Sequence, residues 1–409
     1  MRAALKVIGL EELGMVRLRG ADAVKFLQGQ LSNDVARVSA QRSLLAGYHN
    51  PQGRTIGLLR LVQWDADDIL AVLPRELAAG VASRLGKFVL RAKVKVVDES
   101  AAWRVQGLVG ASPTAVASTI VGAASTAAGA NGELHDSVDV ATAGMAGARR
   151  GLMPSDLPTV VGAQTRVDGA VFVCVSDQPP RWIAVSPVDA PSPVLDYPAA
   201  DFATWQRLEV AAGQPQVYAA TSEEFVAQML NLDALNAIAF DKGCYTGQEV
   251  IARAHYRGRV KRRMQRFVSR EPCRLSPGDS GQLADGRTFK VVVAAQLADG
   301  RCDFLAVAPM LGAPSETGAA SAAAGSDRGA TAGVTTQAVH PEAQPTTDPT
   351  APPVAGPIMD PTLAPIVAAT VAPTVAAAAA LSAATSGATA PANATVIAEQ
   401  AELPYPLPT

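Results

Sequence analysis

Apolar positions in the first hundred residues alternate between helical and strand-like spacing. The spacing predicts a helix over 22–31, then a strand over 55–64 that turns into a second strand over 69–73. Pro74 stands where the first turn of a helix tolerates proline, and apolar residues follow it at helical spacing before another alternating strand at 93–97. Those helix-spaced residues are Leu77, Val81, Leu85 and Phe88. We therefore expect a first α+β module over residues 1–100.

A second, less regular α+β module is expected over residues 101–256. Its middle is rich in Ala and Gly, and two β-rich runs follow at 171–175 and 182–185. Residues 201–212 have the pattern of an amphipathic helix that ends at Gly213-Gln214-Pro215. One face of that helix would carry Phe202, Trp205, Leu208 and Ala212.

Beyond residue 257 the pattern changes to short strands separated by turns. The pentapeptide QLADG occurs at 282–286 and again at 296–300, so that two Asp-Gly turns lie 14 residues apart. Such spacing predicts a small antiparallel sheet or barrel over residues 257–312.

The composition breaks sharply after Gly312. The last 97 residues contain 14 of the 29 prolines, one aromatic residue and eight charged residues. A segment of this kind buries too little apolar surface to offset its ordering entropy, so on composition alone we expect all of residues 313–409 to be disordered. Prolines also interrupt its charge-free stretch, which argues against a membrane anchor.

Charge and cysteine content narrow the class of protein. The whole chain has a net charge of −2, but seven of the 37 acidic residues and only one of the 35 basic residues lie after Gly312, so the preceding body is slightly basic. This balance excludes binding of nucleic acid by bulk charge alone. The four cysteines are too widely spaced for a metal-ligand pair or a disulfide scaffold. Charged residues in the first 20 positions interrupt the apolar core that an export signal needs, so a cytoplasmic protein is expected.

One segment, DKGCYTGQEVIARAHYRG at 241–258, combines a reactive group with a favourable electrostatic setting. Thr246 and Glu249 have capping-box spacing, which predicts a helix that starts at Gly247 and buries Val250, Ile251 and Ala254. Cys244 would then lie just outside a helix N-terminus and near Lys242, where the thiolate is favoured over the thiol. The alternative is a glycine turn with a half-buried structural cysteine.

Seven cations follow within residues 253–266 and begin with Arg253 and Arg257. Such a density suits a polyanionic ligand tail or an RNA backbone, whereas a solvated strand face is the simpler alternative. His49 lies beside a predicted turn and is expected to be structural. The sequence has no H-x-x-x-H, C-x-x-C or phosphate-binding loop, so zinc hydrolysis and nucleotide triphosphate chemistry lack their usual signatures.

The octapeptide KGCYTGQE at 242–249 resembles the signature of the YgfZ-type folate-binding proteins, which act in iron–sulfur cluster assembly and repair. These proteins are relatives of the glycine-cleavage T-protein aminomethyltransferases. The resemblance extends to LRGADAVKFLQGQLSNDV at 18–35, to residues 205–215 and to the F-x-x-Q-x-x-N-L pattern that starts at Phe225. Residues 402–406, ELPYP, also resemble the C-terminal segment of the family. The low-complexity stretch at 313–400 would then be a disordered insertion, and residues 402–409 would return to complete the small barrel.

The resemblance implies an α+β fold of three subdomains, two α+β modules and a C-terminal antiparallel β-barrel, around a central cavity for tetrahydrofolate or a one-carbon derivative. Trp205 matches the folate-contacting tryptophan of the family, although a core role on its helix remains the alternative. Further expected ligand contacts are Lys242, Tyr245, Gln248, Glu249, Arg253 and Arg257. Some relatives have a second tryptophan near the N-terminus, where this chain has Leu13 or Gly14, so one wall of the site is expected to differ.

Three functions are compatible with the sequence. The leading hypothesis is a folate-binding accessory protein that supports iron–sulfur client enzymes, including tRNA-modifying ones, with Cys244 as the reactive residue and no stably bound metal. A folate-dependent aminomethyl or one-carbon transferase is the alternative, and it would not need Cys244. The third is a tRNA-binding protein that uses the cations of 253–266.

Overall fold

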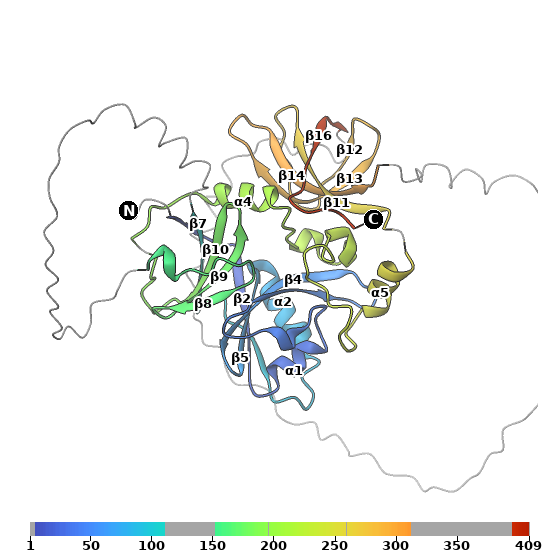
Figure 1. Cartoon of the computed structure of the whole chain (residues 1–409). Helices are drawn as coiled ribbons and strands as arrows, with labels where there is room; N and C mark the ends of the chain where they lie inside the picture. The colour runs from blue at the N-terminus through green and yellow to red at the C-terminus, as the bar shows by residue number, and fades with distance from the viewer. Residues whose placement is uncertain (1–4, 111–151, 195, 259, 312–394, 409) are drawn as a thin grey trace, which may run out of the picture. The chain divides into compact units, whose positions relative to one another are not determined.

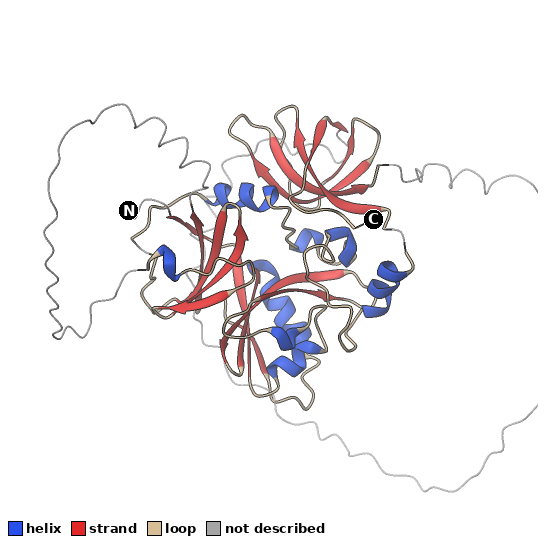
Figure 2. Cartoon of the chain, in the orientation of Figure 1, coloured by secondary structure: helices blue, strands red, loops and turns tan. Residues whose placement is uncertain are grey.

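The computed structural model describes residues 5–110, 152–194, 196–258, 260–311 and 395–408. The Ala- and Gly-rich middle of the second module and residues 313–394 of the predicted disordered segment lie outside these ranges. All described elements belong to one unit, formed by Met1–Ala313 and Thr389–Thr409. The fold is a mixed α/β arrangement of three sheets (Figures 1 and 2).

The first sheet has five strands in the order β3-β4-β5-β2-β6. Its long central hairpin turns at Asp65–Asp68, as the alternation predicts, and the apolar side chains of one face pack against three helices in a single core cluster. The strands are β2 (Leu13–Arg19), β3 (Leu44–His49), β4 (Thr55–Asp65), β5 (Asp68–Pro74) and β6 (Lys95–Asp98), and the helices are α1 (Ala23–Gln28), η1 (Val35–Arg37) and α2 (Arg75–Gly86).

The second sheet also has five strands, in the order β1-β7-β10-β9-β8. The N-terminal strand β1 pairs antiparallel with β7, roughly a hundred residues further along the chain, and the sheet shares a core cluster with Trp205 of α4. The elements are β1 (Leu5–Gly9), β7 (Trp103–Gly110), η2 (Pro154–Asp156), β8 (Gln164–Val167), β9 (Ala170–Asp177), β10 (Pro180–Pro187) and α4 (Phe202–Ala211).

The third sheet is a six-stranded half-barrel in the order β15-β12-β13-β14-β11-β16. The two QLADG repeats form its two β-hairpin turns, and Gly286 and Gly300 occupy equivalent left-handed positions with φ values of 85° and 83°. Its strands are β11 (Arg262–Ser269), β12 (Ser280–Leu283), β13 (Thr288–Gln296), β14 (Cys302–Pro309), β15 (Thr395–Val396) and β16 (Ala398–Ala401). Closure of these strands into a full barrel remains a prediction.

The C-terminal residues join this sheet. β15 pairs with β12 and β16 pairs with β11, so the strand pairing lies before the expected residues 402–409. The end of the segment predicted to be disordered, residues 395–400, is therefore ordered, because its backbone completes the hydrogen bonding of these two strands. Residues 402–408 instead follow β16 toward α4, where Leu403 packs in an apolar cluster and the Tyr405 hydroxyl donates to the carbonyl of Gly213 at 2.7 Å. We call residues 402–408 the C-terminal strap.

Three short helices connect the second and third sheets. They are η3 (Ala219–Thr221), η4 (Ala227–Leu230) and α5 (Gln248–Tyr256), and α5 carries the end of the KGCYTGQE signature. Gln228 from the F-x-x-Q-x-x-N-L pattern donates a side-chain hydrogen bond to the carbonyl of Ile251, and Asn231 donates to the carbonyl of Met264. The polar residues of this pattern therefore fix α5 and β11 to the helical connection.

Candidate folate cavity and exposed cysteine

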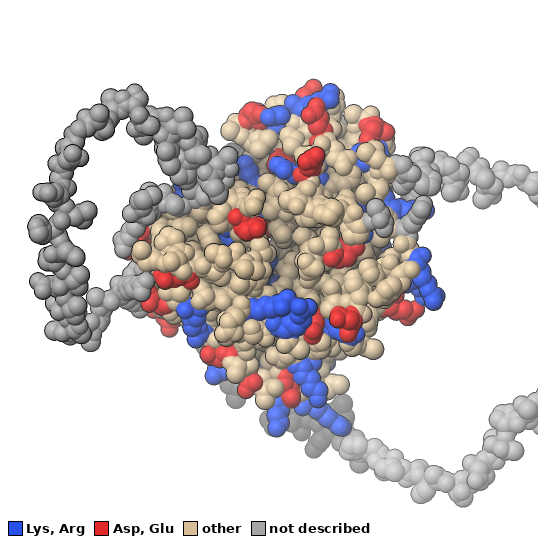
Figure 3. Space-filling model, viewed as in Figure 1, with Lys and Arg blue, Asp and Glu red and all other residues tan. Residues whose placement is uncertain are grey.

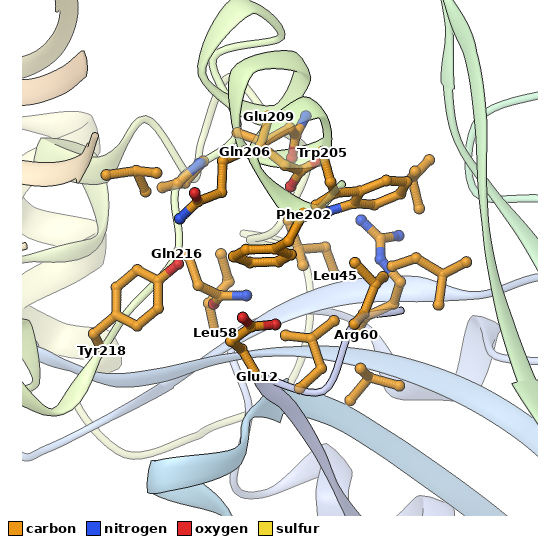
Figure 4. Close-up of a pocket in the computed structure, with 18 residues that line it drawn as sticks. Glu12, Leu45, Leu58, Arg60, Phe202, Trp205, Gln206, Glu209, Gln216 and Tyr218 are labelled. Carbon is orange, nitrogen blue, oxygen red and sulfur yellow. The ribbon is translucent and has the colours of Figure 1, made fainter. Parts of the chain in front are cut away.

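Residues from all three sheets line a cavity that, with its open mouth, encloses about 870 Å³ (Figure 4). This size falls within the range of small-molecule sites. The residues from α4 and the segment after it supply most of the polar groups, whereas the strands supply mainly apolar walls. The α4 and post-α4 contributors are Phe202, Trp205, Gln206, Glu209, Gln214, Pro215, Gln216 and Tyr218.

Trp205 is both a core residue and a wall of this cavity. Its side chain is buried among apolar residues of the second sheet, and it also lines the hollow. Gly107 on β7 makes room for the indole, because a Cβ at that position would lie 2.6 Å from the ring. The two roles that the sequence left open for Trp205 are therefore compatible with each other.

A cation that the sequence pattern did not single out, Arg60 of β4, points toward Trp205 in Figure 4. Within the described residues Arg60 makes no hydrogen bond or ion pair. Burial lowers the pKa of its guanidinium, Glu209 opposes that shift, and the nearby charge of Arg181 adds to it. Because a guanidinium stays charged in proteins, Arg60 is a half-buried cation available to an anionic ligand.

Behind the indole lies a second arginine. Arg181 is fully buried, forms an ion pair with Glu209 and lies with its guanidinium carbon 5.2 Å from the centroid of the Trp205 ring. Its Nε and Nη2 atoms have no hydrogen-bond partner among the described residues. The pair therefore holds the Glu209 carboxylate at the cavity wall and supports the indole from behind.

The opposite side of the cavity carries Glu12, Gln216 and Tyr218, with the Phe202 ring between them and Trp205 (Figure 4). Burial raises the pKa of Tyr218 to about 12, and the negative charges of Glu209, Glu12 and Glu76 contribute in the same direction. At neutral pH Tyr218 is therefore a hydrogen-bond donor. The cavity combines aromatic walls, carboxylates, amides and one cation that has no ion-pair partner among the described residues.

The signature residue Lys242 is placed elsewhere. Its Nζ donates to the backbone carbonyls of Gln28, Leu31 and Asn33 at 2.8, 2.7 and 2.7 Å. All three ammonium donors are thus used to bind the chain that follows α1, and Lys242 does not line the cavity. Burial lowers its pKa to about 8, and Asp34 opposes this shift. The placement gives Lys242 an anchoring role and does not support the expected ligand contact.

The predicted capping box is wrong. The helix α5 begins at Gln248 instead of Gly247, its N-cap Gly247 is left-handed with φ 83°, and the Glu249 carboxylate pairs with Arg253 at 2.7 Å. Gly247 packs against the turn between β3 and β4, where an added Cβ would lie 2.6 Å from the carbonyl oxygen of Asn50. This close approach dictates the helix start, and of the three residues expected on the buried face only Ile251 is buried.

Cys244 lies at the exposed tip of the signature. A Cβ added to its neighbour Gly243 would meet open space, whereas Tyr245 is buried in the core, where burial raises its pKa to about 12. The signature therefore anchors itself through Lys242, Tyr245 and Gly247 and presents Cys244 to solvent. Neither Cys244 nor any other residue of 242–249 lines the cavity that contains Trp205.

The remaining predicted ligand contacts also lie outside the cavity. Gln248 starts α5, Glu249 and Arg253 form an exposed pair on that helix, and Arg257 is exposed at its end. The structure thus separates Trp205 from every other residue that was expected beside the folate.

Most cations of the 253–266 run have structural partners. Arg263 forms a buried pair with Asp233, Arg266 pairs with Asp303, and Arg262 donates to Thr288. These three cations therefore stabilise the third sheet and its packing. Because their charges are already paired or hydrogen-bonded, they give little support to an RNA-binding surface at 253–266.

The described part of the chain holds neither a ready metal site nor a membrane-spanning helix. No group of three or more His, Cys, Asp or Glu side chains in the described ranges is arranged to hold a metal ion. None of the helices described is long and apolar enough to cross a membrane.

The charged residues of the cavity were not predicted from the sequence. Arg60 lies in an alternating apolar strand and Glu209 lies on an amphipathic helix. In each case the local pattern predicts that the charged side chain faces solvent. A weak signal was present in the helix pattern, because Glu209 follows Trp205 by four residues and therefore shares its face.

The fold is that of the glycine-cleavage T-protein. A crystal structure of glycine cleavage system aminomethyltransferase T from Bartonella henselae superimposes with a TM-score of 0.53 over 75% of this chain and 79% of that chain, at 13% sequence identity. No family model matches the sequence.

Within that fold, the chain is similar to curated proteins called tRNA-modifying protein YgfZ. The relative from Yersinia pseudotuberculosis serotype O:1b (strain IP 31758) is 29% identical over 305 residues, which covers 72% of this chain and 82% of the relative. The one from Pectobacterium carotovorum subsp. carotovorum (strain PC1) is 28% identical over 303 residues, which covers 72% of this chain and 80% of the relative. The resemblance drawn from the KGCYTGQE signature is confirmed.

Proposed function

We propose that this protein is a tetrahydrofolate-binding accessory factor that supports assembly or repair of iron–sulfur enzymes, among them enzymes that modify tRNA. The observation that carries the proposal is a cavity lined by Trp205 and Arg60, together with an exposed cysteine that lies outside that cavity. The likeness to the YgfZ proteins and to the T-protein fold supports the same function.

The cavity residues fit the chemistry of a reduced folate. Trp205 and Phe202 would cover the ring systems, and the carboxylates and amides would pair with the polar edge of the pterin. Arg60, which lacks an ion-pair partner among the described residues, would meet the carboxylates of the glutamate tail. When bound, the folate supplies a carrier for one-carbon units, and this chain binds and orients it.

Cys244 would act on a partner from the outside. It is exposed and lies outside the cavity, so a thiol exchange or a brief share in an iron site with a client is the chemistry open to it. A cluster held permanently needs about four ligands, which a single exposed sulfur does not supply. That the isolated chain retains no cluster stays a prediction.

Titration with tetrahydrofolate tests the cavity assignment. Replacing Arg60 with methionine removes the cation and is expected to weaken binding about 10-fold to 100-fold, because a charge-assisted hydrogen bond contributes about 1.5–3 kcal/mol. Trp205→Ala is expected to weaken it as well. Isothermal titration calorimetry measures both.

Cys244→Ala is the matched control in that titration, because Cys244 lies outside the cavity and its loss is expected to leave folate affinity unchanged. Equal affinity of the unaltered protein and Arg60→Met, with both folded, would sink the cavity assignment. Loss of affinity in Cys244→Ala would place the folate at the signature instead.

A one-carbon transferase is the second candidate, supported by the fold that the chain shares with an aminomethyltransferase. One-carbon turnover that survives Cys244→Ala would favour it. Loss of client activity in cells by Cys244→Ala, with folate affinity intact, would favour the accessory role.

A further inference from the structure

A group of positive charges without ion-pair partners among the described residues lies on the first sheet and on the segment between α2 and β6, outside the run at 253–266. Six exposed cations surround two exposed apolar side chains, and we call these eight residues the basic patch. They are Arg19, Lys25, Lys87, Phe88, Leu90, Arg91, Lys93 and Lys95. None of the six cations forms an ion pair with another described residue.

Backbone pairing brings the parts of the basic patch together. Arg19 on β2 is the direct cross-strand partner of Lys95 on β6. The amide of Lys93 donates to the Asp22 carboxylate at 2.6 Å, just before α1, which carries Lys25. Lys87, Phe88, Leu90 and Arg91 follow the end of α2 directly. In Figure 3, Lys and Arg side chains gather with a few acidic ones at the lower end of the molecule, by α1.

Fold stability does not explain this arrangement. Arg19 and Lys95 are like charges directly opposite each other, which destabilises a sheet. The acidic groups nearby are Asp22, Asp67, Asp98 and Asp68, the cross-strand neighbour of Arg19 on β5 that pairs with Arg17, and they are fewer than the cations. An edge strand such as β6 gains protection from lysines, and this is the simplest alternative.

Edge protection, however, does not account for the two apolar side chains. Phe88 is 52% exposed and Leu90 is 87% exposed, and exposed apolar groups beside a sheet edge favour the association that edge lysines prevent. Unpaired cations around an exposed aromatic ring are instead the combination that binds a nucleic acid, with phosphates on the cations and an unstacked base on the ring.

We propose that the basic patch binds a folded RNA with an accessible single-stranded region. The phosphate backbone would lie on Lys87, Arg91, Lys93 and the cations across β6, and Phe88 would stack on an exposed base. This goes beyond the proposed function, since folate binding and Cys244 do not require it, and it places RNA on a different surface from the 253–266 run.

Binding of bulk tRNA by the full chain at several salt concentrations tests the proposal. Changing Lys87, Arg91 and Lys93 together to alanine is expected to weaken binding about 10-fold or more at low salt. It should also reduce the slope of log affinity against log salt by about 2 to 3, roughly 0.9 for each phosphate that is no longer neutralised. Phe88→Ala is expected to weaken binding and leave the slope unchanged.

The control variant has Lys6, Arg270 and Arg274 changed to alanine, which removes the same number of positive charges away from the basic patch. Its tRNA affinity is expected to stay within about twofold of that of the unaltered chain, because only the net charge of the protein changes. Equal losses in both triple variants, or no measurable tRNA binding by the unaltered chain, would overturn the proposal. So would binding to phosphatidylserine vesicles in place of tRNA, because that outcome identifies a membrane surface. Folate titration of the same variants should be unchanged, which separates this proposal from the folate site.

Discussion

At the residue scale, the signature octapeptide divides into one presented residue and several anchors. Lys242 binds three carbonyls after α1, Tyr245 enters the core, and Gly247 allows α5 to approach the β3–β4 turn. Cys244 alone among these four is exposed to solvent. The anchoring residues of the signature therefore fix the position of the Cys244 sulfur.

His49 provides a test of this anchoring region through pH. It is buried, its Nε2 has no hydrogen-bond partner among the described residues, and burial lowers its pKa to about 3. The unfolded chain takes up a proton near pH 6.5 while the folded chain does not, so stability falls as pH drops below 6.5. At about 1.4 kcal/mol per pH unit, the expected loss from this residue between pH 7 and pH 5 is about 2 kcal/mol.

Urea unfolding at pH 7 and pH 5 measures that loss. His49→Asn keeps an acceptor near Thr55 and is expected to be less stable overall but to lose about 2 kcal/mol less between the two pH values. His255→Asn supplies the control, because it removes a histidine and leaves the buried His49 in place, so the loss attributed to His49 should persist. An unchanged dependence in His49→Asn would contradict the buried neutral state of this histidine.

At the scale of elements, the sequence pattern predicted the hairpins whose strands and turns lie close together in the chain. The hairpin of β4 and β5 followed from alternation and an acidic turn, and the β12–β13–β14 hairpins followed from two Asp-Gly turns. The strand β1 was not predicted, because its partner β7 lies far along the chain and five residues carry little periodic signal. The capping box failed because the close packing of Gly247 outweighed a helix-start preference.

The same reasoning explains what was missed in the site. Trp205 could be predicted from a family resemblance, but Arg60, Glu12 and Tyr218 come together only when three sheets meet. No window of sequence contains that information. The cations of 253–266 were visible in sequence, but their partners Asp233 and Asp303 were not.

The C-terminal strap holds the segment that follows α4, which lines the cavity. The Tyr405 hydroxyl donates to Gly213, which directly precedes the cavity residues Gln214–Gln216, and an added Cβ on Gly213 would lie 2.8 Å from the Tyr405 ring. Tyr405→Phe is expected to cost about 1 kcal/mol of stability and to weaken tetrahydrofolate binding, because the segment after α4 loses its tie.

Tyr197→Phe is the matched control for Tyr405→Phe. The Tyr197 hydroxyl also donates to a backbone carbonyl, that of Leu152 at 2.6 Å, but Tyr197 does not line the cavity. Its loss should lower the unfolding midpoint and leave folate affinity unchanged. Equal folate affinities in both variants would show that the strap serves stability alone.

At the scale of the whole molecule, we assign different tasks to different surfaces. A cavity lined from three sheets would bind the folate, the exposed tip of the signature would present Cys244, and the basic patch would bind RNA. Under the proposed function Cys244 would meet a client from outside, which agrees with its exposure and its position outside the cavity lining. The separation of cysteine from cavity is therefore the central claim.

A crystal structure of the chain with tetrahydrofolate tests this claim most directly. We expect the pterin against Trp205 and Phe202, the glutamate carboxylates on Arg60, and a Cys244 thiol that does not touch the ligand. Folate bound against the KGCYTGQE turn, with its ring or tail beside Cys244 and the cavity of Trp205 left free of it, would contradict the claim.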